Sequence, residues 1–127
     1  MTFGQVENRE KITVGFMCGI SAKSTPLVNK MADLVREKKY SEISYYLKSK
    51  NSGEIFLSIL ILERLDEKKL YSLKKDELKL IDFWKSSSTI VLNCLGCLSD
   101  SNMMYELFEN ENSLEEITWL NKILPIK

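Results

Sequence analysis

The chain has 127 residues, of which 44% are hydrophobic and 28% are charged. This composition fits a single globular domain, because it is too apolar for a disordered chain and too short for two full-sized domains. The sequence contains no histidine, which excludes a histidine general base, the Ser-His-Asp and Cys-His nucleophile arrangements and every histidine metal ligand. Basic and acidic residues number 18 each, so the total charge indicates neither a nucleic-acid partner nor an anionic-membrane partner.

Glycine and proline are scarce, with five and two residues, which argues against an all-β sandwich and its many turns. Residues 1–24 show no helical period, and their only strand-like stretch, residues 12–17, has no evident partner strand. We therefore predict an irregular N-terminal segment over 1–24, packed across the helices of a single domain over 25–127.

The first four residues resemble the end of a bacterial secretion signal. Thr2 and Gly4 are small residues at the spacing that signal peptidase requires, and a polar run follows from Gln5. Such a signal-peptide remnant at 1–4 predicts a periplasmic or secreted protein. The alternative is an ordinary N-terminus of a cytoplasmic protein.

Apolar residues at helical spacing predict four helices in the first two thirds of the chain, over residues 26–38, 41–48, 52–66 and 75–86. The helix over 52–66 is apolar around nearly its whole circumference, so we place it at the centre of the fold. Two short helices are expected to begin at residues 100–101 and 112–113, where capping residues stand, and Pro125 ends the second of them.

The stretch 90–98 fits a helix or a strand by its pattern alone, so a comparison of the chain with itself is needed. A shift of 37 residues places segment 46–49 on segment 83–86, both ending in Lys-Ser, and places two leucines of the central helix on two cysteines. A period of this size is typical of paired-helix repeats. It predicts a helix over 88–98.

These repeats resemble those of HEAT and armadillo proteins, over about residues 26–124. The resemblance implies an all-α fold in which helical hairpins stack in a short right-handed superhelix. The leader-like N-terminus, the Lys-Ser turn and the closing Cys-x-Gly-Cys also resemble a family of small, secreted, uncharacterised all-helical bacterial proteins. That second resemblance implies a place in the cell envelope and carries no known activity.

Three cysteines, Cys18, Cys94 and Cys97, raise the question of thiol chemistry, because the last two form a Cys-x-x-Cys motif. In thiol-disulfide enzymes such a pair follows a strand and opens a helix, but the βαβ pattern and the nearby proline of the thioredoxin-like fold are missing. Three thiols are one ligand short of a structural zinc site. We favour buried apolar thiols on one helix face, with or without a disulfide from Cys18 to either of the other two.

Charge is balanced in total but not along the chain: residues 1–50 carry +4, residues 51–99 carry 0 and residues 100–127 carry −4. A stacked superhelix would turn this order into a basic end and an acidic end. The acidic end is a candidate patch for a basic protein partner, made of Glu106, Glu109, Glu111, Glu115 and Glu116. The alternative is that these side chains are the solvated faces of short helices.

The sequence therefore predicts a non-enzymatic protein-binding or structural module of the bacterial cell envelope, with an unidentified protein partner. We expect no catalytic residue, no cofactor, no metal site, no small-molecule substrate and no transmembrane segment. The first alternative is a cytosolic immunity or antitoxin-type protein that neutralises a basic toxin. The second is a thiol-disulfide enzyme that uses Cys94 and Cys97.

Overall fold

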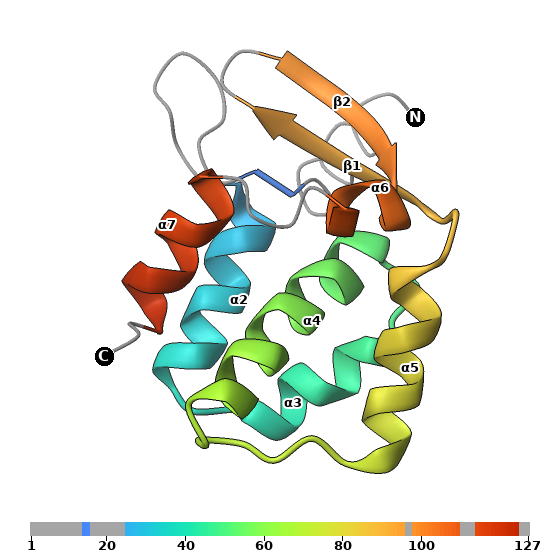
Figure 1. The fold of residues 1–127 in the computed structure, drawn as a ribbon. Coiled ribbons are helices and arrows are strands. Elements are labelled where there is room, and N and C mark those ends of the chain that lie inside the picture. The colour runs from blue at the N-terminus through green and yellow to red at the C-terminus, as the bar shows by residue number, and fades with distance from the viewer. Residues whose placement is uncertain (1–13, 16–24, 96–97, 110–113, 125–127) are drawn as a thin grey trace.

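The computed structural model describes residues 14–15, 25–95, 98–109 and 114–124, with backbone alone for 94–95, 98–101 and 114–116. Figure 1 shows α2 to α5 as one helical body, with a hairpin and α6 across its upper end and α7 at its side. The elements are α2 (Pro26–Arg36), α3 (Tyr40–Tyr45), the 3₁₀ turn η1 (Tyr46–Lys48), α4 (Ser52–Glu67), α5 (Lys75–Lys85), β1 (Ile90–Leu95), β2 (Leu98–Met103), α6 (Met104–Glu109) and α7 (Leu114–Ile123).

The four helices predicted in the first two thirds of the chain are confirmed, and local capping explains where two of them begin. Thr25 Oγ1 accepts a hydrogen bond from the Val28 N–H at 3.4 Å, at the start of α2. Asn51 Oδ1 accepts from two N–H groups in the first turn of α4, at 2.9 and 3.2 Å. The helix predicted over 41–48 is α3 followed directly by η1.

Helix α4 is the centre of the fold, as its all-round apolar sequence predicts. Every residue from Gly53 to Leu62 is buried, and α2, α3, η1, β1 and α7 all contact this helix. The hydroxyl of Ser58, in the middle of the buried stretch, donates to the Glu54 carbonyl oxygen at 2.6 Å. That bond stays within the helix, so burying the hydroxyl leaves no polar group unsatisfied.

Two helix ends in this body have the same geometry. Lys38 after α2 and Lys69 after α4 are in the left-handed region, with φ of 58° and 61°. The N–H of the residue that follows each lysine bonds at 2.9 Å to a leucine carbonyl in the last turn, Leu34 in α2 and Leu65 in α4. This is the Schellman ending of a helix, in which glycine usually takes the left-handed position.

The two Schellman turns lie side by side. The rings of Tyr40 and Tyr71, each two residues beyond the left-handed lysine, are 6.4 Å apart and meet edge to face at 74°. Segments 34–40 and 65–71 share the pattern Leu-x-x-x-Lys-x-Tyr. The structure therefore contains an internal similarity with a spacing of 31 residues, which the comparison at 37 residues did not detect.

The stretch 88–98 corrects the prediction, because it contains a strand where a helix was expected. β1 pairs antiparallel with β2, from Ile90 opposite Met103 to Leu95 opposite Leu98. The Val91 side chain is 0% exposed and that of Ile90 is 50% exposed, the alternation of a strand with one covered face. The predicted second pair of helices is therefore wrong at this point, and the mostly helical fold includes a small sheet.

The hairpin also changes its neighbours. The short helix expected from residues 100–101 begins only at Met104, because the preceding residues pair with β1. Val14, in the stretch for which no partner strand was evident, bridges Asn93 in parallel and donates its N–H to the Leu92 carbonyl at 2.8 Å. That partner was missed because β1 was predicted as a helix.

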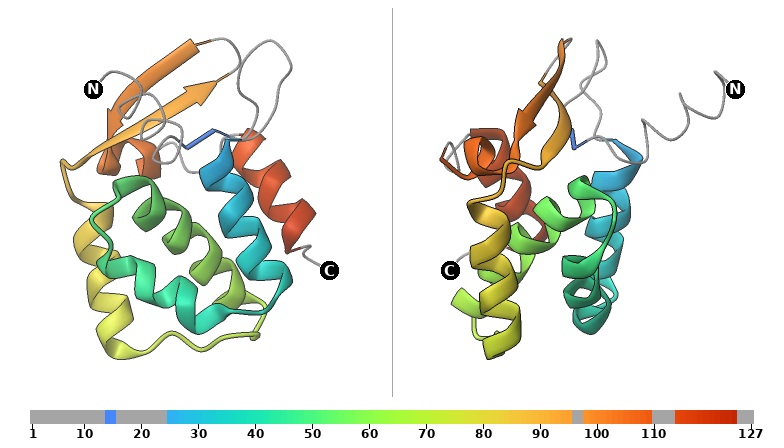
Figure 2. Two further views of the ribbon diagram at one scale, coloured as in Figure 1. Left: turned by 180° about the vertical axis from the view of Figure 1, so that it is seen from behind. Right: turned by 90° about the vertical axis from the view of Figure 1, so that its right-hand side faces the viewer.

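Helix α7 confirms the predicted last helix, but its position overturns the predicted order of charges. It lies against α2 and α4, and Figures 1 and 2 show it alongside α2. Arg64 of α4 binds the C-terminal end of α7. Its Nη1 donates to Asn121 Oδ1 at 3.0 Å and to the Leu124 carbonyl at 2.9 Å. The last helix of the acidic third of the chain thus packs on α2 of the basic first third, so the order of charges along the sequence is not kept in space.

Candidate functional site

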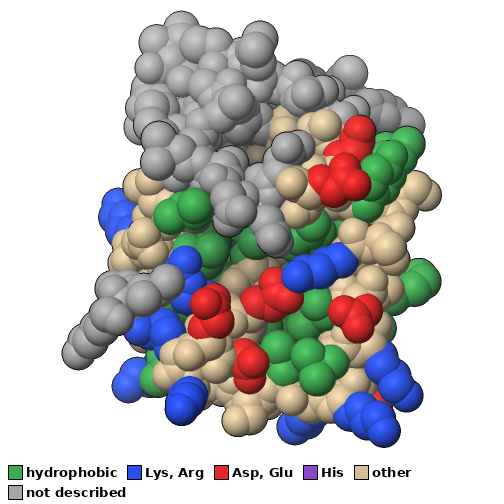
Figure 3. All heavy atoms as spheres, viewed as in Figure 1, with side chains coloured by type: hydrophobic (Ala, Val, Ile, Leu, Met, Phe, Trp, Pro, Cys, Tyr) green, Lys and Arg blue, Asp and Glu red, His purple; other side chains and the backbone are tan. Residues whose placement is uncertain are grey.

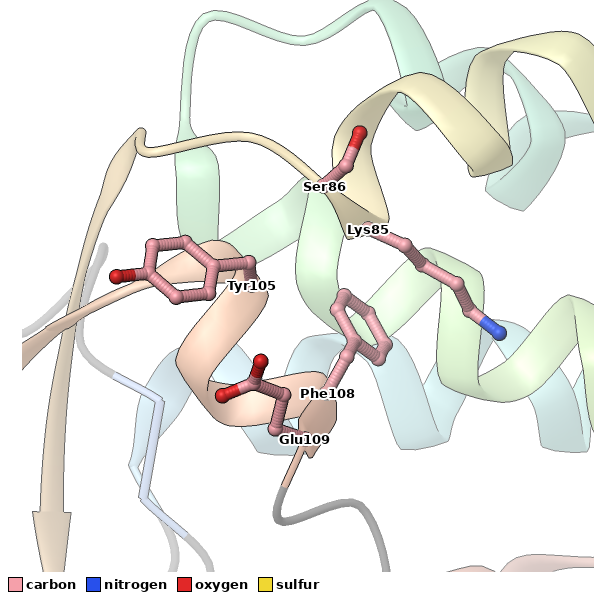
Figure 4. Close-up of a pocket in the computed structure, with 5 residues that line it drawn as sticks. All are labelled: Lys85, Ser86, Tyr105, Phe108 and Glu109. Atoms are coloured by element: carbon pink, nitrogen blue, oxygen red, sulfur yellow. The ribbon is translucent and has the colours of Figure 1, made fainter.

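A hollow of about 520 Å³ opens where the C-terminal end of α5 meets α6. Two backbone hydrogen bonds fix this meeting: the Met104 N–H donates to the Thr89 carbonyl at 2.7 Å and the Tyr105 N–H to the Ser87 carbonyl at 3.0 Å. The first turn of α6 is therefore tied to the segment that leaves α5. The residues that line the hollow are Lys85, Ser86, Tyr105, Phe108 and Glu109 (Figure 4).

Phe108 forms the floor of this hollow. Its side chain is buried and its ring lies 5.0 Å from the ring of Phe56 in α4, centroid to centroid. In Figure 4 the ring stands between Lys85 on one side and Tyr105 and Glu109 on the other. An aromatic floor is thus flanked by one basic and one acidic side chain.

Lys85 is held in place by two contacts. Its Nζ atom is 2.6 Å from Glu63 Oε2 and 5.5 Å from the centre of the Phe108 ring. The second distance is within reach of a cation–π contact. The lysine therefore connects α5, α4 and α6, and its charge is already balanced by a neighbouring carboxylate.

The predicted acidic patch is only partly brought together. Glu109 is exposed and lines the hollow, whereas Glu106 Oε1 accepts a hydrogen bond from the Met103 N–H at 2.8 Å, just before α6. Glu115 and Glu116 lie in α7, with side chains outside the described atoms, and Glu111 is outside the described residues. Of the five predicted residues, Glu109 is the one that the structure places at the hollow.

The cysteine motif is not arranged as sequence reasoning expected. Cys94 lies in β1, opposite Ser99 of β2, so the predicted place on an inward helix face is wrong. The segment after the motif is a strand, whereas a thioredoxin-type pair opens a helix. Cys97 and Cys18 lie outside the described residues, and the predicted disulfide from Cys18 stays a prediction.

A second hollow of about 270 Å³ lies between α3, η1 and the first turns of α5, and Glu77 reaches it. This side chain is buried, yet its carboxylate has three donors. Oε2 accepts from the hydroxyls of Ser44 and Tyr71, the latter at 2.6 Å, and Oε1 accepts from the Lys74 N–H at 2.6 Å. The carboxylate therefore ties α3 and the segment before α5 to the start of α5.

The electrostatics of this second hollow follow from those bonds. Burial raises the pKa of Glu77, but the hydrogen bonds from Ser44, Tyr71 and the Lys74 backbone, with the Lys74 charge, outweigh it and hold the pKa below its usual value. Burial, and then the hydrogen bond to Glu77, raises the pKa of the Tyr71 hydroxyl. Glu77 stands three residues after Lys74, the N-cap position of α5, and accepts the N–H of that residue as the glutamate of a capping box does. Because a lysine stands where that motif has serine or threonine, the sequence pattern did not reveal this role.

Within the described part of the chain, no group of three or more cysteine and acidic side chains is arranged to hold a metal ion. None of the helices in that part combines the length and the apolar character that a bilayer span needs.

Protein-family models, curated proteins and solved structures provide no match to this chain. We therefore infer its function from the geometry of its own residues.

Proposed function

We propose that this protein is a non-enzymatic protein-binding module, and that the hollow between α5 and α6 is part of its contact surface. The observation that supports this proposal is the arrangement of side chains around Phe108. An aromatic floor lies between Lys85 and Glu109, with Tyr105 beside it. Protein interfaces are typically organised in this way, with aromatic anchors at the centre and charged groups at the rim.

The elements that meet near the hollow also expose apolar side chains. Among the described residues, six large hydrophobic side chains are exposed, and four of them belong to α5 and to the paired ends of the hairpin, namely Leu78, Phe83, Ile90 and Met103. Figure 3 shows hydrophobic side chains at the surface of the face that α4, α5 and α6 present, with acidic and basic side chains between them. A mixed surface of this kind suits a protein partner.

The state of the charged groups favours binding over chemistry. Lys85 is paired with Glu63 at 2.6 Å, and the buried carboxylate of Glu77 receives three hydrogen bonds. General bases and nucleophiles need a group whose protonation state is set for reaction. In these two hollows Lys85 and Glu77 instead connect neighbouring helices through their ion pair and hydrogen bonds.

Site-specific photocross-linking tests the proposal. A photoreactive phenylalanine analogue replaces Tyr105 at the hollow, and in a matched variant it replaces Tyr45, an aromatic residue on α3 that is 74% exposed. After irradiation in extracts of the source organism, we expect a discrete protein adduct from position 105 and none from position 45. Adducts of equal yield at both positions, or none at position 105, would contradict the proposal.

The protein found in this way is then purified and its affinity is measured. Glu109→Lys should weaken binding, because it removes the acidic rim beside a lysine, while Glu42→Lys on α3 should leave the affinity unchanged. A basic toxin, the partner of an immunity or antitoxin-type protein, would bind with an affinity that falls steeply with salt. Fractionation of the source cells separates the envelope location that we propose from the cytoplasmic alternative.

A further inference from the structure

The two connections that leave α2 and α4 concentrate basic charge at one end of the molecule. Residues 37–39 and 68–74 contain one glutamate and five lysines, a local charge of +4 in a chain whose total is zero. Figure 3 shows Lys and Arg side chains along the lower edge of the molecule, where these connections run in Figure 1. We call residues 37–39 and 68–74 the lysine end.

Two lysines of this end occupy positions that disfavour them. Lys38 and Lys69 both have a positive φ, a conformation in which a Cβ atom clashes and glycine is the usual residue. The helix dipole explains why cations gather near a helix C-terminus. It does not explain a lysine at the left-handed position itself, and backbone strain of this kind is typical of functional sites.

Acidic side chains in and beside the lysine end compensate part of its charge, since Glu37 pairs with Lys39 of the end itself and the charge of Lys74 acts on Glu77. Glu37 lies 3.1 Å from the Nζ atom of Lys39, Asp66 Oδ1 accepts a hydrogen bond from the Leu73 N–H, and Glu67 lies 4.0 Å from Arg64 Nε. The ion pair of Glu37 is exposed to solvent and therefore weak. The basic character of the end is thus only partly compensated.

Leu70 lies between these lysines in sequence and is 50% exposed. We propose that the lysine end binds the surface of an anionic phospholipid bilayer, with the ammonium groups at the lipid phosphates and Leu70 entering the headgroup layer. Clusters of four to eight basic residues are typical of binding to anionic lipid, and an apolar side chain among them adds burial at the interface.

The same residues favour a bilayer over a single-stranded nucleic acid. Single-stranded nucleic acid is bound on exposed aromatic rings, but Tyr40 and Tyr71 are half-buried and face one another. Arg36, the arginine nearest to the lysine end, is paired with Asp33. The hollow beside α6 is at the other end of α5 (Figure 1), so a bilayer at the lysine end leaves it open to a protein partner.

Vesicle co-sedimentation of the full chain tests this inference. The vesicles contain either phosphatidylcholine alone or equal parts of phosphatidylcholine and phosphatidylglycerol. We expect binding to the mixed vesicles at low salt, weaker binding at physiological salt and none to phosphatidylcholine. The double variant Lys38→Gly/Lys69→Gly should bind about 30-fold more weakly, since each lysine at an anionic surface contributes about 1 kcal/mol.

This variant separates binding from folding, because glycine fits both positions and should raise the melting temperature while the affinity falls. The matched control is Lys79→Ala/Lys122→Ala, which removes the same charge from exposed positions in α5 and α7 and should change the affinity less than about twofold. Equal losses in both double variants, or no binding by the wild type, would overturn the inference. So would binding of a single-stranded oligonucleotide through Lys38 and Lys69 without binding to the mixed vesicles.

Discussion

The helical body over residues 26–85 and the hairpin over residues 90–103 differ in how far their local sequence specifies their secondary structure. In the body, each helix carries its own apolar stripe, and Thr25 and Asn51 accept hydrogen bonds from the first turns of α2 and α4. In the hairpin, β1 is apolar and fits a helix equally well, while β2 reads Leu-Ser-Asp-Ser-Asn-Met. Serine, aspartate and asparagine are typical of turns, so β2 has no strand pattern of its own.

The difference shows that the helices are set locally and the strands by their partners. Val91 of β1 is buried beside the body, Asn93 Nδ2 donates to Asn102 Oδ1 across the strands at 3.0 Å, and Val14 adds a bridge from the N-terminal segment. None of these contacts is visible in a window of local sequence. We therefore expect the body to tolerate loss of hairpin contacts better than loss of its own central helix.

The largest effect is expected in α4. Leu57→Ala removes a leucine side chain that is 0% exposed, so it should lower the free energy of unfolding by about 2–5 kcal/mol. Leu70→Ala is the matched control, because that leucine is half-exposed, and it should change the stability by less than about 0.5 kcal/mol. Urea denaturation measures both, and similar midpoints for the two variants would contradict a centre at α4.

The same distinction explains how much of the fold the sequence predicted. The helices of the body and α7 were found from apolar spacing and capping residues, which act within a few residues of each other. The helix predicted over 88–98 is wrong, because the Lys-Ser match at a shift of 37 residues does not correspond to a structural repeat. The similarity that the structure contains, Leu34 to Tyr40 with Leu65 to Tyr71, lies at turns, where apolar spacing gives no signal.

The candidate site was less predictable than the fold. Glu109 was named as part of an acidic patch, but the patch assumed that sequence order is kept in space. The chemistry of the hollow depends on Lys85, which is 24 residues away from Glu109, and on Phe108 being held against α4. Such a site depends on how α5 and α6 are placed relative to each other. That placement follows from the pairing of β1 with β2, which the sequence pattern did not predict.

The second prediction tests the hairpin directly. Val91→Ala should lower the free energy of unfolding by about 2 kcal/mol, because this valine is fully buried. Ile90→Ala, one residue earlier and half-exposed, should cost less than about 0.5 kcal/mol. Equal losses measured by chemical denaturation would contradict the burial of only one face of this strand.

The third prediction concerns the buried carboxylate of the body. Glu77→Gln keeps the shape of the side chain but weakens the hydrogen bonds from Ser44, Tyr71 and Lys74. We expect a loss of about 1.5 kcal/mol at neutral pH. Asp76→Asn makes the same change of charge at an exposed neighbour and should have a much smaller effect. Equal losses of stability in the two variants would contradict the conclusion that the hydrogen bonds of Glu77 stabilise the helical body.

This third effect should depend on pH in one direction. The pKa of Glu77 is lowered in the folded protein from its usual value of 4.5, so the unfolded chain binds more protons as the pH falls below that value. The contribution of Glu77 is therefore fully present above about pH 5 and is lost as the pH falls through the folded pKa. The difference between wild type and Glu77→Gln should shrink in acid, and a difference that grows in acid would contradict the lowered pKa.

The smallest effect is expected at the two Schellman turns, and there the sign is the test. Lys69→Gly should raise the free energy of unfolding by about 0.5–1 kcal/mol, because glycine relieves a φ of 61°. Lys68→Gly, one residue earlier with a φ of −83°, should instead lower it by a similar amount, since glycine there only adds flexibility to the unfolded chain. Thermal denaturation of the two variants should therefore move the melting temperature in opposite directions. Shifts of the same sign would mean that the backbone at position 69 is not strained. Lysine at the left-handed positions 38 and 69 would then not lower the stability of the fold.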